Sequence, residues 1–173
     1  MNIFATSFNT QEAVSHLDDL RLNKMILETA QMLSSAYRCL FGDDTRLYKI
    51  THFNHPCSIW ARDNVHHYSW LVQYFDDLAK EKMRRDLTRI SDPIPHKSWN
   101  ELFEMFNSKK TNDYQTKLSV QFFKFNCTEF KSEPDLRIAY RKQLVKKWQN
   151  DIRPPKWTST NIPYFFDTYK SDK

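Results

Sequence analysis

The chain has 173 residues, a length that predicts one domain with a substantial core. It contains a single glycine, which argues against a sheet-rich fold or a glycine-rich nucleotide loop, because tight hairpins and phosphate-binding loops depend on glycine. The net charge is +5, and the excess lies in residues 131–173, which carry 10 Lys and Arg against 5 Asp and Glu. We therefore predict a compact all-α domain over residues 1–173 whose basic C-terminal part contacts a polyanion, with nucleic acid as the first candidate.

Two long helices are predicted in the first half of the chain, packed on each other. The first begins at Asn9, which has capping-box spacing to Glu12, and continues to about Leu40, before Gly42. The second begins at Pro56 and continues to about residue 89. Its apolar stripe has the helical spacing of three and four residues and consists of Trp60, Asn64, Tyr68, Leu71, Phe75 and Leu78.

The second half of the chain is predicted to be less regular. A third helix starts near Ser98, residues 107–118 form a polar loop, and the aromatic segment 119–130 fits either a short strand or irregular packing. A basic helix follows Pro134, and an extended tail begins at Arg153.

Cysteine content and hydropathy indicate the compartment. The three cysteines are an odd number without CxxC spacing, which predicts neither a disulfide framework nor a zinc ribbon. No signal peptide is evident, and no apolar run approaches the length of about 18 residues that a membrane span requires. We expect a cytoplasmic protein without a cofactor.

Charged residues of the first predicted helix fall where apolar residues are expected. On a helical wheel, an arc of roughly 80° lies between Leu20/Leu27 and Met25/Met32. This arc, called here the charged stripe, contains Arg21, Lys24, Glu28 and Gln31. The opposite arc, with His16 and Ser34 among others, is the expected solvent face.

Two interpretations of the charged stripe remain open. It can be an internal salt-bridge cluster, with Asp18 and Asp19 at its edge, or the floor of a polar cleft. In a cleft, Glu28 beside two cations can stabilise charge or transfer a proton, and Lys24 can act as nucleophile or base.

A second group of polar residues occurs in THFNHPC, residues 51–57. His52, Asn54 and His55 lie at the start of the second predicted helix, where unpaired backbone N–H groups favour phosphate or another anion. A metal site with His52, His55 and Cys57 is the alternative, but no second HxxH or CxxC half accompanies it, and we predict no metal.

Taken together, these motifs resemble those of a family of small, mostly phage-encoded proteins of undefined function. The shared segments are MNIF, DDLRLNKMILETAQ, THFNHPCSIWA and HKS. More distantly, the order of the parts is similar to that of the pyrimidine-dimer DNA glycosylase family. The matching stretches are residues 16–24, 48–62 and 153–157. This resemblance implies an all-helical enzyme that flips a nucleotide, cleaves the glycosidic bond through an imine to its N-terminal amine and nicks the strand.

The chain departs from that glycosylase pattern at two positions. Asn2 is poorly suited to removal of the preceding methionine, and the family's catalytic glutamate would fall on Leu22. Glu28 is then the acid of the charged stripe that could substitute, and Lys24 could supply the amine.

We therefore predict a phage-type DNA glycosylase, with or without AP-lyase activity, that acts on a damaged or modified pyrimidine in double-stranded DNA in the host cytoplasm. The alternatives are a non-catalytic inhibitor or adaptor, and a base-modifying or metal-dependent nucleic-acid hydrolase. The predicted catalytic residues are Arg21, Lys24, Glu28, Asn54 and His55. The predicted DNA-binding residues are His52, Arg62, Lys97, Arg137, Arg141, Lys146, Lys147, Lys156 and Trp157.

Overall fold

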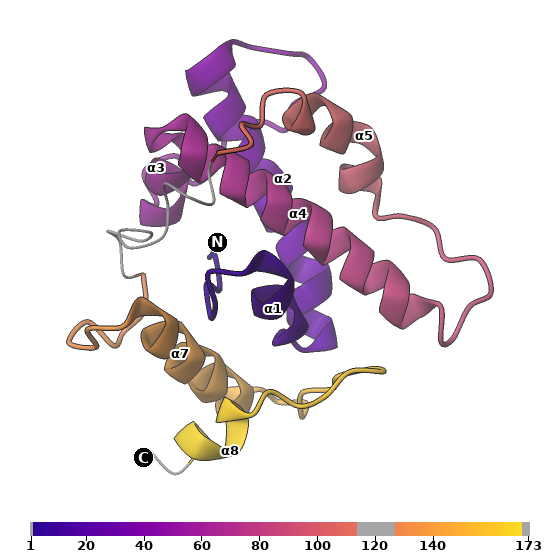
Figure 1. The fold of residues 1–173 in the computed structure, drawn as a ribbon, viewed down its shortest axis with the longest axis vertical. Coiled ribbons are helices and arrows are strands. Elements are labelled where there is room, and N and C mark those ends of the chain that lie inside the picture. Colours follow the sequence, from indigo (N-terminus) through magenta and orange to yellow (C-terminus); the bar gives the residue numbers. More distant parts are fainter. Residues whose placement is uncertain (1, 114–126, 171–173) are drawn as a thin grey trace.

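The computed structural model describes residues 2–113 and 127–170, and every regular element in these ranges is a helix (Figure 1). The predicted all-helical fold is confirmed. The helices are α1 (Thr10–Ser15), α2 (Asp19–Phe41), α3 (Pro56–Asp63), α4 (Val65–Asp86), α5 (Lys97–Asn107), α7 (Leu136–Asn150) and α8 (Phe165–Lys170).

The predicted first helix is divided in two. Its N-cap is confirmed, since Asn9 Oδ1 accepts a hydrogen bond from the backbone N–H of Glu12 at 2.9 Å, whereas the Glu12 side chain accepts from Ser7 Oγ and does not complete a capping box. A single helix over residues 9–40 is wrong, however, because the backbone leaves the helix between His16 and Asp18. The carbonyl of His16 accepts from Trp157 Nε1 at 3.1 Å, and the backbone N–H of Asp19 donates to a carbonyl of the C-terminal tail at 2.8 Å. Contacts across the fold therefore replace the local helical hydrogen bonds.

The predicted second helix is also interrupted, at Asn64. Asn64 adopts an extended backbone, and its Oδ1 caps α4 by accepting from the backbone N–H groups of His66 and His67 at 2.9 and 3.0 Å. Asn64 is thus an N-cap residue rather than part of a continuous apolar stripe. The end of α4 at Asp86 is close to the predicted end.

The core lies between α2 and α4, with α1, α3 and α5 packed around this pair. The predicted packing of two long helices is confirmed. Large aromatic side chains fill much of the core, and those that are completely buried include Trp60, Tyr68, Tyr74, Phe75, Phe106, Tyr140 and Phe165.

The C-terminal part forms α7 and α8, which pack on each other and lie below α1 in the view of Figure 1. The basic helix after Pro134 is confirmed by α7. The tail is not extended throughout, because α8 forms and Phe165 stacks with Trp148 at 6.2 Å between ring centroids. Most of the aromatic segment 119–130 lies outside the described residues.

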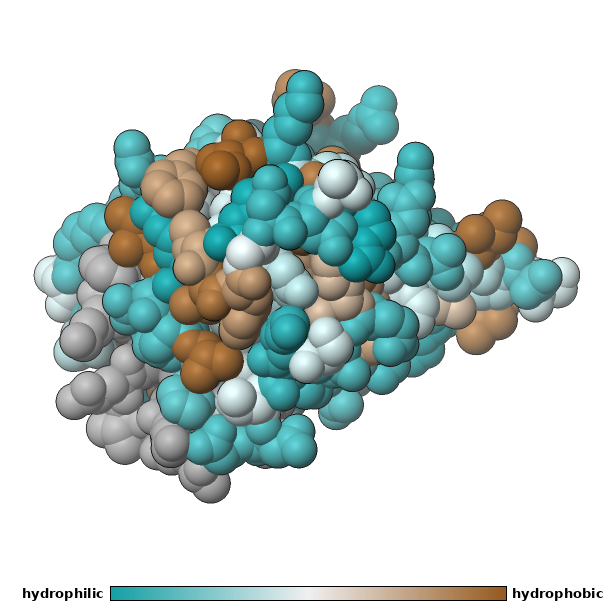
Figure 2. Space-filling model, turned by 90° about the horizontal axis from the view of Figure 1, so that it is seen from above, coloured by the Kyte–Doolittle hydropathy of each residue, from teal (hydrophilic) through white to brown (hydrophobic). Residues whose placement is uncertain are grey.

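The surface in Figure 2 shows apolar residues in small groups between hydrophilic ones. Among the residues that the structure describes, no helix is long and apolar enough to cross a membrane.

Candidate active site at Glu28

The amino-terminal segment is held between the helices and leads to the charged stripe. Residues 3–7 are buried, and the carbonyl of Thr6 accepts from Arg141 Nε at 3.0 Å. Thr6 Oγ1 also lies 2.9 Å from Nδ1 of His16, and Trp70 Nε1 donates to the carbonyl of Phe8 at 3.1 Å. These contacts to α7, α4 and the end of α1 fix the start of the chain in the interior.

Glu28 is the residue that this segment reaches. The backbone N–H of Asn2 donates to Glu28 Oε2 at 3.2 Å, and Lys24 Nζ lies 3.5 Å from Glu28 Oε1. The side chain of Glu28 is 16% exposed, whereas that of Lys24 is 69% exposed. A half-buried carboxylate therefore has a main-chain donor on one oxygen and a solvent-facing ammonium on the other.

Arg21 does not belong to the same cluster. Its Nη1 lies 3.1 Å from Asp18 Oδ1 and 2.7 Å from Asp151 Oδ2, and its Nη2 donates to Asp151 Oδ1 at 2.9 Å. Burial alone would lower the pKa of Arg21, but its bonds to Asp151 and Asp18 raise it above the ordinary value. The guanidinium thus joins the start of α2 to the end of α7, about 10 Å along the helix from Glu28.

Each of the two interpretations of the charged stripe consequently applies to one end of it. The Arg21 end is a buried salt-bridge cluster, in which Asp18 also accepts from Trp148 Nε1 at 2.8 Å. The Lys24–Glu28 end is open to solvent. The expected solvent face on the opposite arc is wrong for His16 and Ser34, which are buried. His16 follows α1 and does not share the wheel of α2, and Ser34 lies beneath the segment after α2, where its Oγ accepts from the backbone N–H of Tyr48 at 3.2 Å.

His55 forms a second side of the site. It is the N-cap of α3, and its Nδ1 accepts from the backbone N–H of Cys57 at 3.2 Å. Burial lowers the pKa of His55, nearby His52 lowers it further, and the charge of Glu28 opposes these effects. A neutral His55 that accepts through Nδ1 carries its proton on Nε2, which leaves an N–H donor for a ligand.

The turn that carries His55 is tightly held. His52 adopts a positive φ of 47°, and its carbonyl accepts from the backbone N–H of His55 at 2.9 Å. Arg62 donates to the carbonyl of Phe53 and lies over the Phe53 ring, 3.7 Å from its centroid. Arg62 thus supports the turn, while His52 and Asn54 are exposed to solvent.

Several predicted DNA-binding residues make intramolecular contacts. Arg137 forms a two-pronged pair with Asp135 at 3.0 and 2.6 Å, and Arg141 holds the amino-terminal segment through Thr6. Trp157 is partly buried against Trp148. The lysines of the set are exposed, Lys97 beside Glu101 and Lys146 beside Glu129, together with Lys147 and Lys156.

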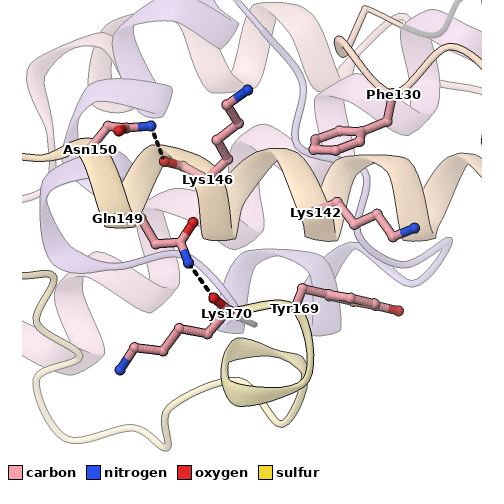
Figure 3. A pocket seen from close by; sticks show the side chains of 7 residues that line it. All are labelled: Phe130, Lys142, Lys146, Gln149, Asn150, Tyr169 and Lys170. Carbon is pink, nitrogen blue, oxygen red and sulfur yellow. Dashed lines mark hydrogen bonds between the residues drawn. The ribbon is translucent and has the colours of Figure 1, made fainter. Parts of the chain in front are cut away.

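Lys146 also lines a cavity of about 750 Å³ between α7 and α8 (Figure 3). Figure 3 shows three lysine side chains and two aromatic rings around it. Two of these lysines are already paired with acids, Lys142 with Glu133 and Lys146 with Glu129. The residues are Phe130, Lys142, Lys146, Gln149, Asn150, Tyr169 and Lys170.

Across residues 2–113 and 127–170, no group of three or more His, Cys, Asp or Glu side chains is arranged to hold a metal ion.

The sequence patterns did not identify Asn2 or Asp151 as partners of the charged stripe. The apolar residues near the start of the chain could have indicated that this segment is buried, and therefore that Asn2 lies close to the helices. The pairing of Asp151 with Arg21 spans 130 positions and has no local signal.

A comparison with known protein families matches the first half of the chain. Residues 1–92 match the model of a family described as pyrimidine dimer DNA glycosylase. The match covers α1–α4 and therefore includes Asn2, Lys24, Glu28 and His55. No curated protein and no solved structure matches the chain.

Proposed function

Since the chain belongs to the pyrimidine dimer DNA glycosylase family, we propose that it excises a damaged or modified pyrimidine from DNA at the Glu28 site. The observation that carries the proposal is the meeting of Asn2, Lys24 and Glu28, at 3.2 and 3.5 Å. It places an amine against a carboxylate, the pair of groups that imine chemistry on a sugar requires.

We assign the attacking amine to Lys24. Its Nζ would bond to C1′ of the flipped nucleotide, and the base would leave with the electron pair of the glycosidic bond and take up a proton from Nζ. The C1′–O4′ bond would then break as the second proton passes from Nζ to O4′, which opens the sugar ring and leaves an imine between Lys24 and C1′. Glu28 would stabilise the positive charge that develops on the sugar, and in a subsequent lyase step it would accept a proton from C2′ as the 3′ phosphate leaves. The side chain of Lys24 is solvent-facing in the free protein, so it is accessible to bound DNA.

His55 and Asn54 would bind the phosphate or sugar beside the lesion. The Nε2–H of His55 and the first turn of α3 both favour an anion. Arg21 is assigned a positioning role, since its ion pairs fix α2 against α7. The phage-type motifs further predict action in a host cytoplasm.

Borohydride trapping on duplex DNA tests the proposal. We expect covalent adducts with a pyrimidine-dimer duplex and with an abasic duplex, which isolates the lyase step. Trypsin cleaves after Arg21, Lys24 and Arg38, so an adduct on Lys24 would appear in residues 22–38. An adduct in residues 1–21 would instead identify the amino-terminal amine and refute the assignment to Lys24.

Two variants with matched controls complete the test. Lys24→Gln and Glu28→Gln should each lower the trapping rate about 100-fold or more, the size expected for loss of a nucleophile or an acid–base group. Lys80→Gln is the control for Lys24, because Lys80 is also exposed and paired with an acid one turn away. Glu101→Gln is the control for Glu28. Wild-type protein that neither releases base nor forms an adduct would refute the proposed function.

A further inference from the structure

Two cysteine thiols from distant parts of the chain meet beside the amino-terminal segment. Cys57 lies in the first turn of α3, and Cys127 lies ahead of α7. Their Sγ atoms are 3.3 Å apart across a sequence separation of 70 residues. The covalent S–S distance is about 2.05 Å, so an approach of little more than 1 Å would join them. Cys127 lies outside regular helix, where such a shift requires little rearrangement.

The two thiols differ in exposure. Cys57 is 2% exposed and Cys127 is half-buried. Cys57 donates its S–H toward Cys127 and also lies 3.7 Å from Asn2 Oδ1. An oxidant from solvent would therefore reach Cys127 first, with Cys57 directly behind it.

The more exposed thiol, that of Cys127, is also the more acidic one. The hydrogen bond from Cys57 lowers the pKa of Cys127 to about 7, against the opposing effect of burial, and the charge of Lys131 adds to the lowering. The same hydrogen bond and burial raise the pKa of Cys57. Cys127 is thus the thiol of the pair that loses its proton first, and Cys57 is the partner that keeps its proton.

We propose that Cys57 and Cys127 form a redox-active dithiol that a peroxide oxidises to a disulfide. The Cys127 thiolate attacks one peroxide oxygen, the O–O bond breaks, and hydroxide leaves and is protonated to water, giving a sulfenic acid on Cys127. The Cys57 sulfur then attacks Cys127 Sγ as its proton passes to the departing oxygen, and a second water leaves. Overall, two thiols lose two electrons and hydrogen peroxide becomes two water molecules.

The disulfide would restrain the fold. It would close the loop from residue 57 to residue 127, which contains α4 and α5. A cross-link that closes a loop of this size stabilises the folded protein, because it reduces the conformational freedom of the unfolded chain. We therefore expect the melting temperature to rise by roughly 5–10 °C. The thiol hydrogen of Cys57, for which Cys127 Sγ and Asn2 Oδ1 are the two nearby acceptors, would be lost at the same time.

The test is oxidation of the full-length protein with one equivalent of hydrogen peroxide, followed by thiol titration under denaturing conditions. We expect the three thiols to fall to one. A non-reducing tryptic map should then join residues 50–62 to residues 125–131, while residues 39–46, which contain Cys39, stay reduced. The melting temperature should rise, and a dithiol reductant should reverse the change.

Variants separate the proposed steps. Cys57→Ser should leave a sulfenic acid on Cys127 that dimedone traps, and Cys127→Ser should leave Cys57 unreacted. Cys39→Ser, which changes an exposed cysteine of α2, should behave as wild type. Three thiols that remain titratable after peroxide, or a disulfide that includes Cys39, would overturn the proposal. Either result can be read on wild-type protein, so the test does not depend on the folding of a variant.

Discussion

Replacement of Arg21 by Met separates a structural role from a catalytic one. Met keeps much of the apolar volume and removes the charge that lies 2.7–3.1 Å from Asp18 and Asp151. Asp18 is 1% exposed, so its carboxylate would lose a cation without gaining water. Asp151 has a side chain that is 25% exposed and would be rehydrated.

The cost can be bounded from these contacts. Removing one partner of a buried ion pair costs about 3–5 kcal/mol. Asp18 keeps its hydrogen bond from Trp148 Nε1, which together with the rehydration of Asp151 favours the lower bound. We expect a loss of about 3 kcal/mol in unfolding free energy, which corresponds to a fall of roughly 6–12 °C in melting temperature for a chain of this size.

The assay combines thermal unfolding at pH 7 with borohydride trapping well below the melting temperature. Arg21→Met should melt earlier and still form the adduct once folded. Arg46→Met is the control, because Arg46 pairs with Asp44 on the surface, where loss of an ion pair should leave the melting temperature nearly unchanged. An Arg21→Met protein with an unchanged melting temperature and no trapping would refute the structural role and return Arg21 to the reacting groups.

Three further predictions concern pH, DNA and backbone conformation. Burial lowers the pKa of His16 from 6.5 to about 4, so the folded state binds fewer protons than the unfolded state below pH 6.5. The stability that is present above pH 6.5 should thus fall by about 3 kcal/mol as the pH drops toward 4. Urea denaturation of His16→Gln should show a flatter dependence of stability on pH, and an unchanged dependence would contradict this cause. Lys147→Gln, which removes an exposed lysine of α7, should reduce the slope of log K against log salt for duplex binding by about 1, whereas Lys80→Gln should leave it unchanged. Gly42→Ala should lower the free energy of thermal unfolding by about 1–2 kcal/mol, because Gly42 has a φ of 104°, which residues with a Cβ rarely adopt. An added Cβ meets no neighbour, so the cost comes from the backbone alone, and a neutral effect would show that the backbone relaxes.

The amino-acid sequence by itself determined the helical class and the position of most helices. One glycine, apolar residues at spacings of three and four, and the start signals at Asn9 and Pro56 are local features that act within one or two turns. The same local reasoning located Lys24 and Glu28, which are neighbours because they are four residues apart on α2.

Only the tertiary structure decided where the long helices break and which charges share a site. Trp157 donates a hydrogen bond to the carbonyl of His16, 141 positions away in the sequence, and Arg21 donates to the carboxylate of Asp151, 130 positions away. A helical wheel contains no information about such partners, because it assumes an unbroken helix and places residues only relative to their near neighbours. For the same reason the sequence pattern could not show that the backbone N–H of Asn2 donates to Glu28, or that the thiols of Cys57 and Cys127 lie next to each other. These contacts depend on how distant segments pack, since burial selects their partners after the helices have formed.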